Sequence, residues 1–192
     1  MDRQIIISIG REYGSGGHEI ARRLSQKLGM PLLDSTLFQA AAADSPELKK
    51  YDEKVKNVWF SRSVSGYSNS IEENIAQKEF DFIQEKAAAG ESFVVVGRCS
   101  DFILRDNPNL VSCFITSETA AKLERIETYY GVEKGKAEAA MHRKDKARAE
   151  YHDQHCKTSW GKARSYDLTI DSSRFGIDGT VELIFSAIAF AK

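Results

Sequence analysis

Short apolar runs alternate with longer amphipathic segments along most of the chain. The apolar runs lie at residues 5–9, 93–96, 111–115 and 166–170, with a shorter one at 31–34. Most are rich in β-branched residues, which is typical of strands buried on both faces of a parallel sheet. Helical patterns begin near residues 18 and 118 and cover 71–89, 133–156 and 181–190. The alternation predicts a three-layer α/β fold, with a parallel core sheet of about five strands and helices on both faces.

The turn after the first apolar run contains three glycines within four residues, and an amphipathic helix follows it directly. Glycine allows positive φ and close approach of the backbone to a ligand. A helix start offers unpaired N–H groups and a partial positive charge, both of which suit an anion. We therefore predict a phosphate-binding loop made by Arg11, Gly14, Ser15, Gly16, Gly17 and His18. The alternative is a tight strand-to-helix turn without a ligand, because glycines are common in turns.

The loop departs from the general P-loop pattern, G-x-x-x-x-G-K-[ST]. With Gly16 as the second glycine, Arg11 takes the first glycine position, Gly17 the lysine position and His18 the Ser/Thr position. Gly17 has no ammonium group for the phosphates. His18 has no hydroxyl for Mg²⁺, and neutral imidazole is a poor ligand for a hard cation. Arg11 is the candidate to supply the missing positive charge.

Composition limits the functional classes. The 27 Lys and Arg residues nearly balance the 28 Asp and Glu residues, which argues against a general nucleic-acid binder. No apolar run is long enough to span a membrane. The three scattered cysteines fit reduced thiols in a cytoplasmic protein. A chain of 192 residues is expected to form a single domain, 1–192, with a polar insertion at about 35–70.

Two other predicted strands end in polar side chains, and ligands of parallel sheets bind at such ends. Arg98 follows the run at 93–96 and carries the planar fork that grips phosphate oxygens. Its alternative role is a structural ion pair with Asp101 or Asp34. Asp34 ends the short strand, where it would orient an acceptor phosphate or hold a water on Mg²⁺. Asp34 is equally suited to cap a helix over residues 35–43.

The predicted helix at 133–156 is densely charged, and in isolation such a run is usually a solvated face. Arg143 and Arg148 lie five residues apart, so on a regular helix they diverge by about 140°. They cannot then both reach one phosphate, and Arg148 is the better candidate. The spacing of His152, His155 and Cys156 lacks a fourth zinc ligand, so we interpret these residues as packing and predict no metal site built by the protein alone.

Five segments together resemble the cytidylate kinase-like family of small P-loop kinases, and they cover nearly the whole chain. They are SIGREYGSGG at 8–17, LGMPLLD at 28–34, VGRCSD at 96–101, RKDKARAEY at 143–151 and SYDLTIDS at 165–172. The loop without lysine is itself characteristic of this branch. The resemblance implies a nucleoside-monophosphate-kinase fold with a helical lid at about 133–165.

The resemblance also implies an activity: transfer of the γ-phosphoryl group of ATP, bound with Mg²⁺, to a nucleoside monophosphate such as CMP or another pyrimidine nucleotide. Arg98, Asp34 and Asp101 would then handle the acceptor, with Asp34 or Asp101 anchoring Mg²⁺ through water. Arg143 and Arg148 would act from the lid on the transferring group. The alternative is a nucleotide-binding regulatory or scaffold protein with little turnover, which the missing lysine and hydroxyl favour.

Overall fold

A computed structural model describes residues 3–34 and 69–191, with side chains from residue 76 onward in the second range. Five parallel strands form one sheet in the order β2-β3-β1-β4-β5. Their bounds are Ile6–Arg11 (β1), Leu32–Leu33 (β2), Phe93–Val96 (β3), Leu110–Thr116 (β4) and Leu168–Asp171 (β5). The helices are Gly17–Leu28 (α1), Asn69–Ala88 (α4), Ser100–Ile103 (α5), Thr119–Thr128 (α6), Ala137–His155 (α7) and Ser172–Ile188 (α8), with a 3₁₀ turn at Ala163–Ser165. The predicted fold class is confirmed.

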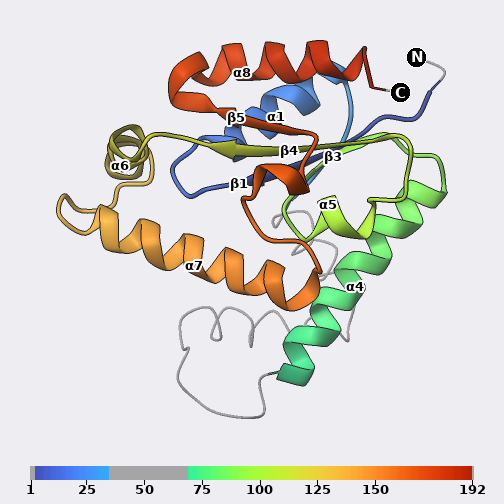
Figure 1. Cartoon of the computed structure of the whole chain (residues 1–192), viewed down its shortest axis with the longest axis horizontal. Coiled ribbons are helices and arrows are strands. Elements are labelled where there is room, and N and C mark those ends of the chain that lie inside the picture. The colour runs from blue at the N-terminus through green and yellow to red at the C-terminus, as the bar shows by residue number, and fades with distance from the viewer. Residues whose placement is uncertain (1–2, 35–68, 192) are drawn as a thin grey trace.

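The sheet is covered on both faces, as its continuous apolar strands require. Helices α1 and α8 pack on one face, and α4 and α5 lie on the other, where α7 also runs (Figure 1). Side chains alternate along β1, so Ile7 and Ile9 join Leu24 of α1 in one buried cluster. Ile6 points the opposite way, into a second cluster with Ile83 of α4. The two clusters form the core that fixes β1 at the centre of the sheet.

The central position of β1 places its carboxyl end beside those of β3 and β4. Ile9 is in register with Val96 on one side and with Cys113 on the other. The hydroxyls of Ser8 and Ser100 lie 2.6 Å apart and connect β1 to α5 beneath this edge. The turns that follow β1 and β3 are therefore neighbours in space.

The largest difference from the sequence prediction concerns the last helix. It begins at Ser172, nine residues before the expected start at Val181. The Asp171 carboxylate accepts a hydrogen bond from the Ser173 N–H and so caps the helix. Gly176, with φ of 69° and ψ of 175°, then interrupts the helical geometry, and this break obscured the helical pattern in the sequence. The 166–170 prediction is likewise shifted, because β5 begins at Leu168.

Other boundaries agree more closely with the sequence. The charged helix predicted at 133–156 is α7, Ala137–His155, and the helix predicted at 71–89 is α4, which begins at Asn69. The predicted insertion at about 35–70 lies outside the described residues except for its last two, which open α4. The possible helix at 35–43 also lies outside them. Within residues 3–34 and 69–191, each helix is too short or too polar to cross a membrane.

Candidate phosphate-binding site

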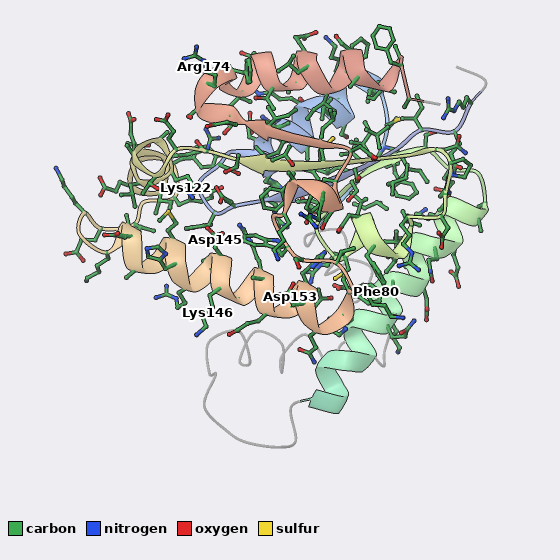
Figure 2. All side chains as sticks on the ribbon, viewed as in Figure 1. Phe80, Lys122, Asp145, Lys146, Asp153 and Arg174 are labelled. Atoms are coloured by element: carbon green, nitrogen blue, oxygen red, sulfur yellow. The ribbon has the colours of Figure 1, made fainter. Side chains whose placement is uncertain are left out.

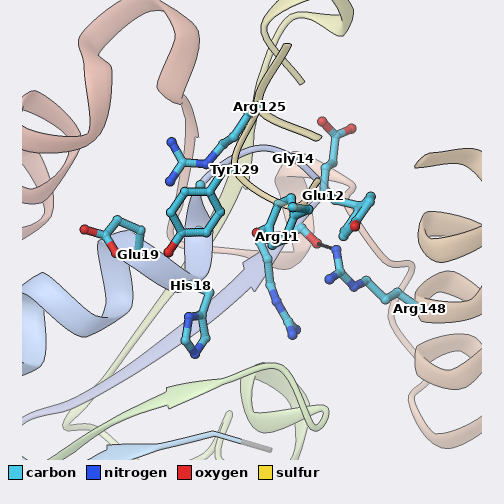
Figure 3. Close-up of a pocket in the computed structure, with 12 residues that line it drawn as sticks. Arg11, Glu12, Gly14, His18, Glu19, Arg125, Tyr129 and Arg148 are labelled. Carbon is cyan, nitrogen blue, oxygen red and sulfur yellow. Dashed lines mark hydrogen bonds between the residues drawn. The ribbon is translucent and has the colours of Figure 1, made fainter. Parts of the chain in front are cut away.

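A cavity of about 210 Å³ lies at the carboxyl end of β1, in front of the N-terminus of α1 (Figure 3). The loop after β1 forms its floor, and α6 and α7 contribute side chains to its walls. Three arginines from three elements line it, together with a group of tyrosines and the predicted loop residues other than Ser15, which lines an adjoining cavity. The arginines are Arg11, Arg125 and Arg148.

The loop backbone requires glycine at the predicted positions. Gly14 and Gly16 have φ of 86° and 77°, in the left-handed region that side chains rarely adopt. A Cβ on Gly14 would lie 2.7 Å from the carbonyl oxygen of Lys122, and one on Gly16 would collide with Ile177 of α8. Gly16 is also the N-cap of α1, so the unpaired N–H groups of the first turn follow it.

Arg11 fills the room that a lysine at position 17 would need. A Cβ on Gly17 would lie only 2.5 Å from the Arg11 Cβ, and the Arg11 guanidinium lies against Gly97 in the turn after β3. Among the described residues, no carboxylate lies within ion-pair distance of this guanidinium. Burial, followed by the charges of Arg148 and Arg98, lowers the pKa of Arg11 to about 9. The group is a poorly compensated cation, and an anion in the cavity would stabilise it.

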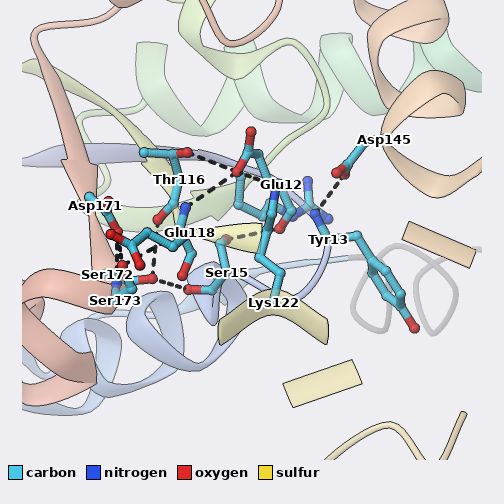
Figure 4. A network of polar contacts seen from close by, with 12 residues as sticks. Glu12, Tyr13, Ser15, Thr116, Glu118, Lys122, Asp145, Asp171, Ser172 and Ser173 are labelled. Carbon is cyan, nitrogen blue, oxygen red and sulfur yellow. Dashed lines mark hydrogen bonds and ion pairs between the residues drawn. The ribbon is translucent and has the colours of Figure 1, made fainter. Parts of the chain in front are cut away.

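A network of hydrogen bonds holds the loop in place (Figure 4). One oxygen of Glu12, Oε2, accepts from Thr116 Oγ1 at 2.8 Å and from Lys122 Nζ at 2.9 Å. The Ser15 hydroxyl donates to the carbonyl of Glu12, and the Ser172 hydroxyl donates to the carbonyl of Ser15 at 2.6 Å. The loop is therefore fixed to β4, α6 and α8 before any ligand binds.

Helix α7 contacts the same loop through two side chains. Asp145 Oδ1 accepts a 2.6 Å hydrogen bond from the Tyr13 N–H, and Arg148 Nη1 donates to the Arg11 carbonyl at 3.3 Å. Asp145 lies on the side of α7 that faces the sheet, whereas Lys146 points the other way (Figure 2). Arg143 is exposed and does not line the cavity. The helix is regular, and it presents one of the two candidate arginines to the cavity.

The other predicted site residues lie around the cavity rather than in its lining. Asp34 Oδ2 is 2.8 Å from Nε2 of His18, so the end of β2 meets the start of α1. Arg98 has a positive φ of 59°, which is uncommon for a residue with a side chain, and its Nη1 lies 3.2 Å from Glu79. Burial raises the pKa of Glu79, and Arg98 opposes that rise. The ion-pair partner is thus a carboxylate of α4 that the sequence analysis did not consider.

Asp101 points to the far end of α7. Its Oδ2 lies 3.0 Å from Nε2 of His152, and both side chains are buried. Burial lowers the pKa of His152, but the hydrogen bond to Asp101 and contact with Cys156 outweigh it and raise the pKa to about 10. No cluster of three potential ligands in the described part of the chain has the geometry of a metal site.

Several residues of the site escaped the sequence analysis. Glu12, Lys122 and Asp145 hold the loop, and Arg125 borders the cavity. Tyr13 stacks on Tyr130 with ring centroids 5.0 Å apart, and both line the cavity. Two signals in the sequence could have pointed to them: the charged Glu12 beside the glycine loop, and the adjacent tyrosines Tyr129 and Tyr130 after a polar helix.

The strand order and the glycine loop between β1 and α1 define a P-loop kinase fold. A gluconokinase from Sinorhizobium meliloti 1021 has this fold, with a TM-score of 0.61 and 14% identity over 98% of this chain and 95% of that one. A shikimate kinase from Acinetobacter baumannii, solved in complex with shikimate, gives a TM-score of 0.60 at 11% identity, over 100% of this chain and 96% of that one. At such identities the likeness concerns the fold alone.

The sequence profile of the cytidylate kinase-like family matches residues 6–174. The chain belongs to this family. A solved structure of an uncharacterised protein from Eubacterium ventriosum ATCC 27560 is 35% identical, with a TM-score of 0.79 over 97% of this chain and 99% of that one. No curated protein matches the chain. Family and fold together support a kinase-like phosphotransferase.

Proposed function

We propose that this protein binds the phosphates of ATP in the cavity after β1 and transfers the γ-phosphoryl group to a nucleoside monophosphate, CMP or another pyrimidine nucleotide. One observation carries the proposal: Arg11 lies at a helix N-terminus, close to two other arginines and without a carboxylate partner among the described residues. Such an arrangement is unfavourable when empty and becomes favourable when phosphate oxygens enter it.

The residues of the loop have separate tasks in this scheme. The N–H groups from Gly14 to His18 bind the donor phosphates, and Arg11 provides the charge that lysine provides in other P-loops. Arg148 approaches from α7 and neutralises charge on the transferring group, whereas Arg143 faces solvent. Phosphoryl transfer depends mainly on positioning and charge neutralisation, so it requires little further chemistry from the protein.

A second cavity, of about 360 Å³, supports the placement of the donor. It adjoins the first, because Gly14, Arg125 and Tyr129 line both. Its remaining walls come from α6 and from the start of α8, including Ser173 and Ile177. We place the ribose and base of the donor here, with its phosphates passing over Gly14 into the smaller cavity.

The acceptor belongs on the side of β2 and β3. Arg98 would leave Glu79, or share it, to hold the acceptor phosphate. Both carboxylates lie against a histidine, but Asp34 lies at the start of α1 beside the phosphate loop, so it is the better candidate for water-mediated anchoring of Mg²⁺ than Asp101 at the far end of α7. Bound Mg²⁺ would neutralise donor phosphate oxygens, and the carboxylate of Asp34 would orient its water.

A coupled phosphotransfer assay with ATP and Mg²⁺ over the common nucleoside monophosphates tests the proposal. We expect turnover with at least one pyrimidine monophosphate and its loss in Arg148→Ala. Absence of turnover with every monophosphate, from protein that binds ATP, would contradict the proposed transfer.

One observation favours a second function, nucleotide binding with little turnover. Position 17 has no lysine and position 18 has no hydroxyl, so two groups that assist catalysis in other P-loops are missing. Measuring affinity beside turnover separates the functions: a regulatory protein would bind ATP at micromolar concentrations and transfer no phosphate to any acceptor.

A further inference from the structure

Two cysteines far apart in the sequence meet in a buried cluster outside the phosphate cavity. Cys99 and Cys156 pack there with Ala76 and Phe80 of α4, and Figure 2 shows Phe80 beside the end of α7. Cys99 is 3% exposed and Cys156 is 8% exposed. Both thiols belong to this one cluster, and each shifts the pKa of the other. Cys99 lies in the turn that carries Arg98, whereas Cys156 ends the helix that carries Arg148.

The positions of these cysteines in their elements are informative. Cys99 follows Arg98 directly and is the N-cap of α5, with a φ of 55°. Cys156 is the C-cap of α7, where its N–H donates to the His152 carbonyl at 2.7 Å. A helix end opens more easily than a helix centre, so Cys156 is the thiol that solvent reaches first.

A histidine next to the pair is held in place by a carboxylate. Asp101 Oδ2 lies 3.0 Å from His152 Nε2, and His152 lies one helical turn before Cys156, whose N–H donates to the His152 carbonyl. The neighbouring Cys99 thiol, and after it His152, lower the pKa of Cys156, while Cys156 and burial raise that of Cys99. The pair therefore consists of one activated thiol and one protonated thiol, which is the combination that oxidation to a disulfide uses.

We propose that Cys99 and Cys156 form a reversible intramolecular disulfide when the protein meets a peroxide. The Cys156 thiolate attacks one oxygen of hydrogen peroxide and becomes a sulfenic acid, and the hydroxide released takes up a proton to give water. Cys99 then attacks the sulfenic sulfur, the S–S bond forms, and a second water leaves. Two thiols lose two electrons in total, and one peroxide gains them. A dithiol reductant reverses the reaction by exchange.

The bond would join the turn that carries Arg98 to the end of the helix that carries Arg148. If α7 must move for nucleotides to enter or leave, the oxidised protein turns over more slowly. This consequence rests on the proposed function, whereas formation of the bond does not. Failure of the kinase assay would therefore leave the disulfide proposal standing, and failure of the disulfide would leave the kinase proposal standing.

The chain contains its own control. Cys113 lies in β4 with no exposed surface, and burial raises the pKa of its thiol. It belongs to the apolar core on the α1 side of the sheet, not to the cluster of Cys99 and Cys156. A non-selective oxidation of unfolded protein would involve all three cysteines, whereas the proposal involves two.

The test is peptide mapping of the wild-type chain after brief treatment with hydrogen peroxide at low protein concentration. We expect a Cys99–Cys156 cross-linked peptide, loss of two free thiols per chain, an unmodified Cys113, and recovery of all thiols with dithiothreitol. In Cys99→Ser, a dimedone probe should label Cys156, because no resolving thiol remains. Cross-links that include Cys113, or intact thiols at Cys99 and Cys156 at peroxide levels that oxidise exposed protein thiols, would overturn the proposal.

Discussion

The carboxyl ends of β1 and β3, with the turns that follow them, lie side by side at one edge of the sheet, and each region carries an arginine, but their charges are arranged differently. At the end of β1, Arg11 has other arginines as its main charged neighbours, and the loop that follows is held by hydrogen bonds to four further elements. After β3, Arg98 lies against Glu79, and Asp101 lies against His152. The charges of the first turn favour an anion, because its buried cation lies among other cations. The second has largely satisfied its own charges.

The difference teaches which half of the proposed site is preformed. A ligand that meets Arg11 relieves repulsion among cations and displaces no carboxylate from that guanidinium, although the nearby Arg148 is paired with Asp145 at 3.4 Å. A ligand at Arg98 must compete with Glu79, so its binding energy is reduced by the pair that it displaces. We therefore expect the donor side to bind more tightly than the acceptor side, and substitutions on the two sides to behave differently.

The largest effect is expected from Gly16→Val. A branched side chain at this left-handed position collides with Ile177 and blocks the anion at the start of α1. ATP binding, measured by calorimetry, should fall below detection while circular dichroism still shows a folded protein. Gly29→Ala is the control, because Gly29 also has positive φ but a Cβ there meets nothing within 4 Å. If folded Gly16→Val kept its affinity for ATP, the assignment of this loop as the phosphate-binding site would be wrong.

The two arginines of α7 form a matched pair for the next largest effect. Arg148→Ala should lower kcat by about 10³-fold or more, since an arginine at the transferring phosphate contributes on the order of 10³–10⁵ in rate. ATP affinity should change little. Arg143→Ala, exposed on the same helix, should remain within about threefold of the parent. Similar kcat values for the two variants would indicate that the charged residues of α7 form an ordinary solvated face with no role in phosphoryl transfer.

Arg98→Ala tests the β3 side. A charge-assisted phosphate contact contributes about 1.5–3 kcal/mol, so CMP affinity should fall by about one to two decades, while ATP affinity is nearly unchanged. Calorimetry with each nucleotide separately gives the comparison. Glu79→Gln should have the opposite effect and raise the affinity for CMP, because it removes the carboxylate that competes for Arg98. Equal losses for ATP and CMP in Arg98→Ala would indicate a structural ion pair instead.

The smallest effect concerns Glu19, an acid at the edge of the phosphate cavity. Hydrogen bonds from Arg22, then from Arg23, outweigh burial and lower the pKa of Glu19 to about 2. Glu19→Gln should lower the free energy of unfolding at pH 7 by only about 0.5–1 kcal/mol, because both arginines are substantially exposed. The pKa of Glu19 is lower in the folded protein than in the unfolded chain, where it is near 4.5, so the ionised carboxylate stabilises the folded state at pH values above about 4.5. The difference between variant and parent should therefore be constant above pH 5 and disappear as the pH falls towards 2.

Much of the fold could be predicted from sequence because its signals are local. Four buried runs gave strands close to their observed bounds, and the glycines of the loop indicated its position. The angular argument on Arg143 and Arg148 also needed only helix geometry, and it agrees with where α7 places them. Their roles remain predictions.

The remaining features depend on partners that are distant in sequence. Glu12 could bind many basic residues, and only the packing of α6 on the loop selects Lys122. Asp101 was predicted to handle the acceptor, and only the packing of α7 places His152 beside it. No periodicity encodes such pairs. The early start of α8 has a local cause instead. Asp171 is a recognisable helix cap in the sequence, but Gly176 interrupts the helical pattern shortly after it.

Whether Arg11 takes over the charge of the absent lysine can be measured with one variant, Arg11→Met, in parallel with Arg11→Lys. Because Arg11 is a buried cation among cations, its removal should raise the thermal midpoint of the ligand-free protein while weakening ATP by about 10–100-fold. Arg11→Lys keeps the charge and should retain more of the affinity. Opposite changes in stability and ATP affinity in Arg11→Met are the result that this account predicts. Lower stability with unchanged ATP affinity would contradict it.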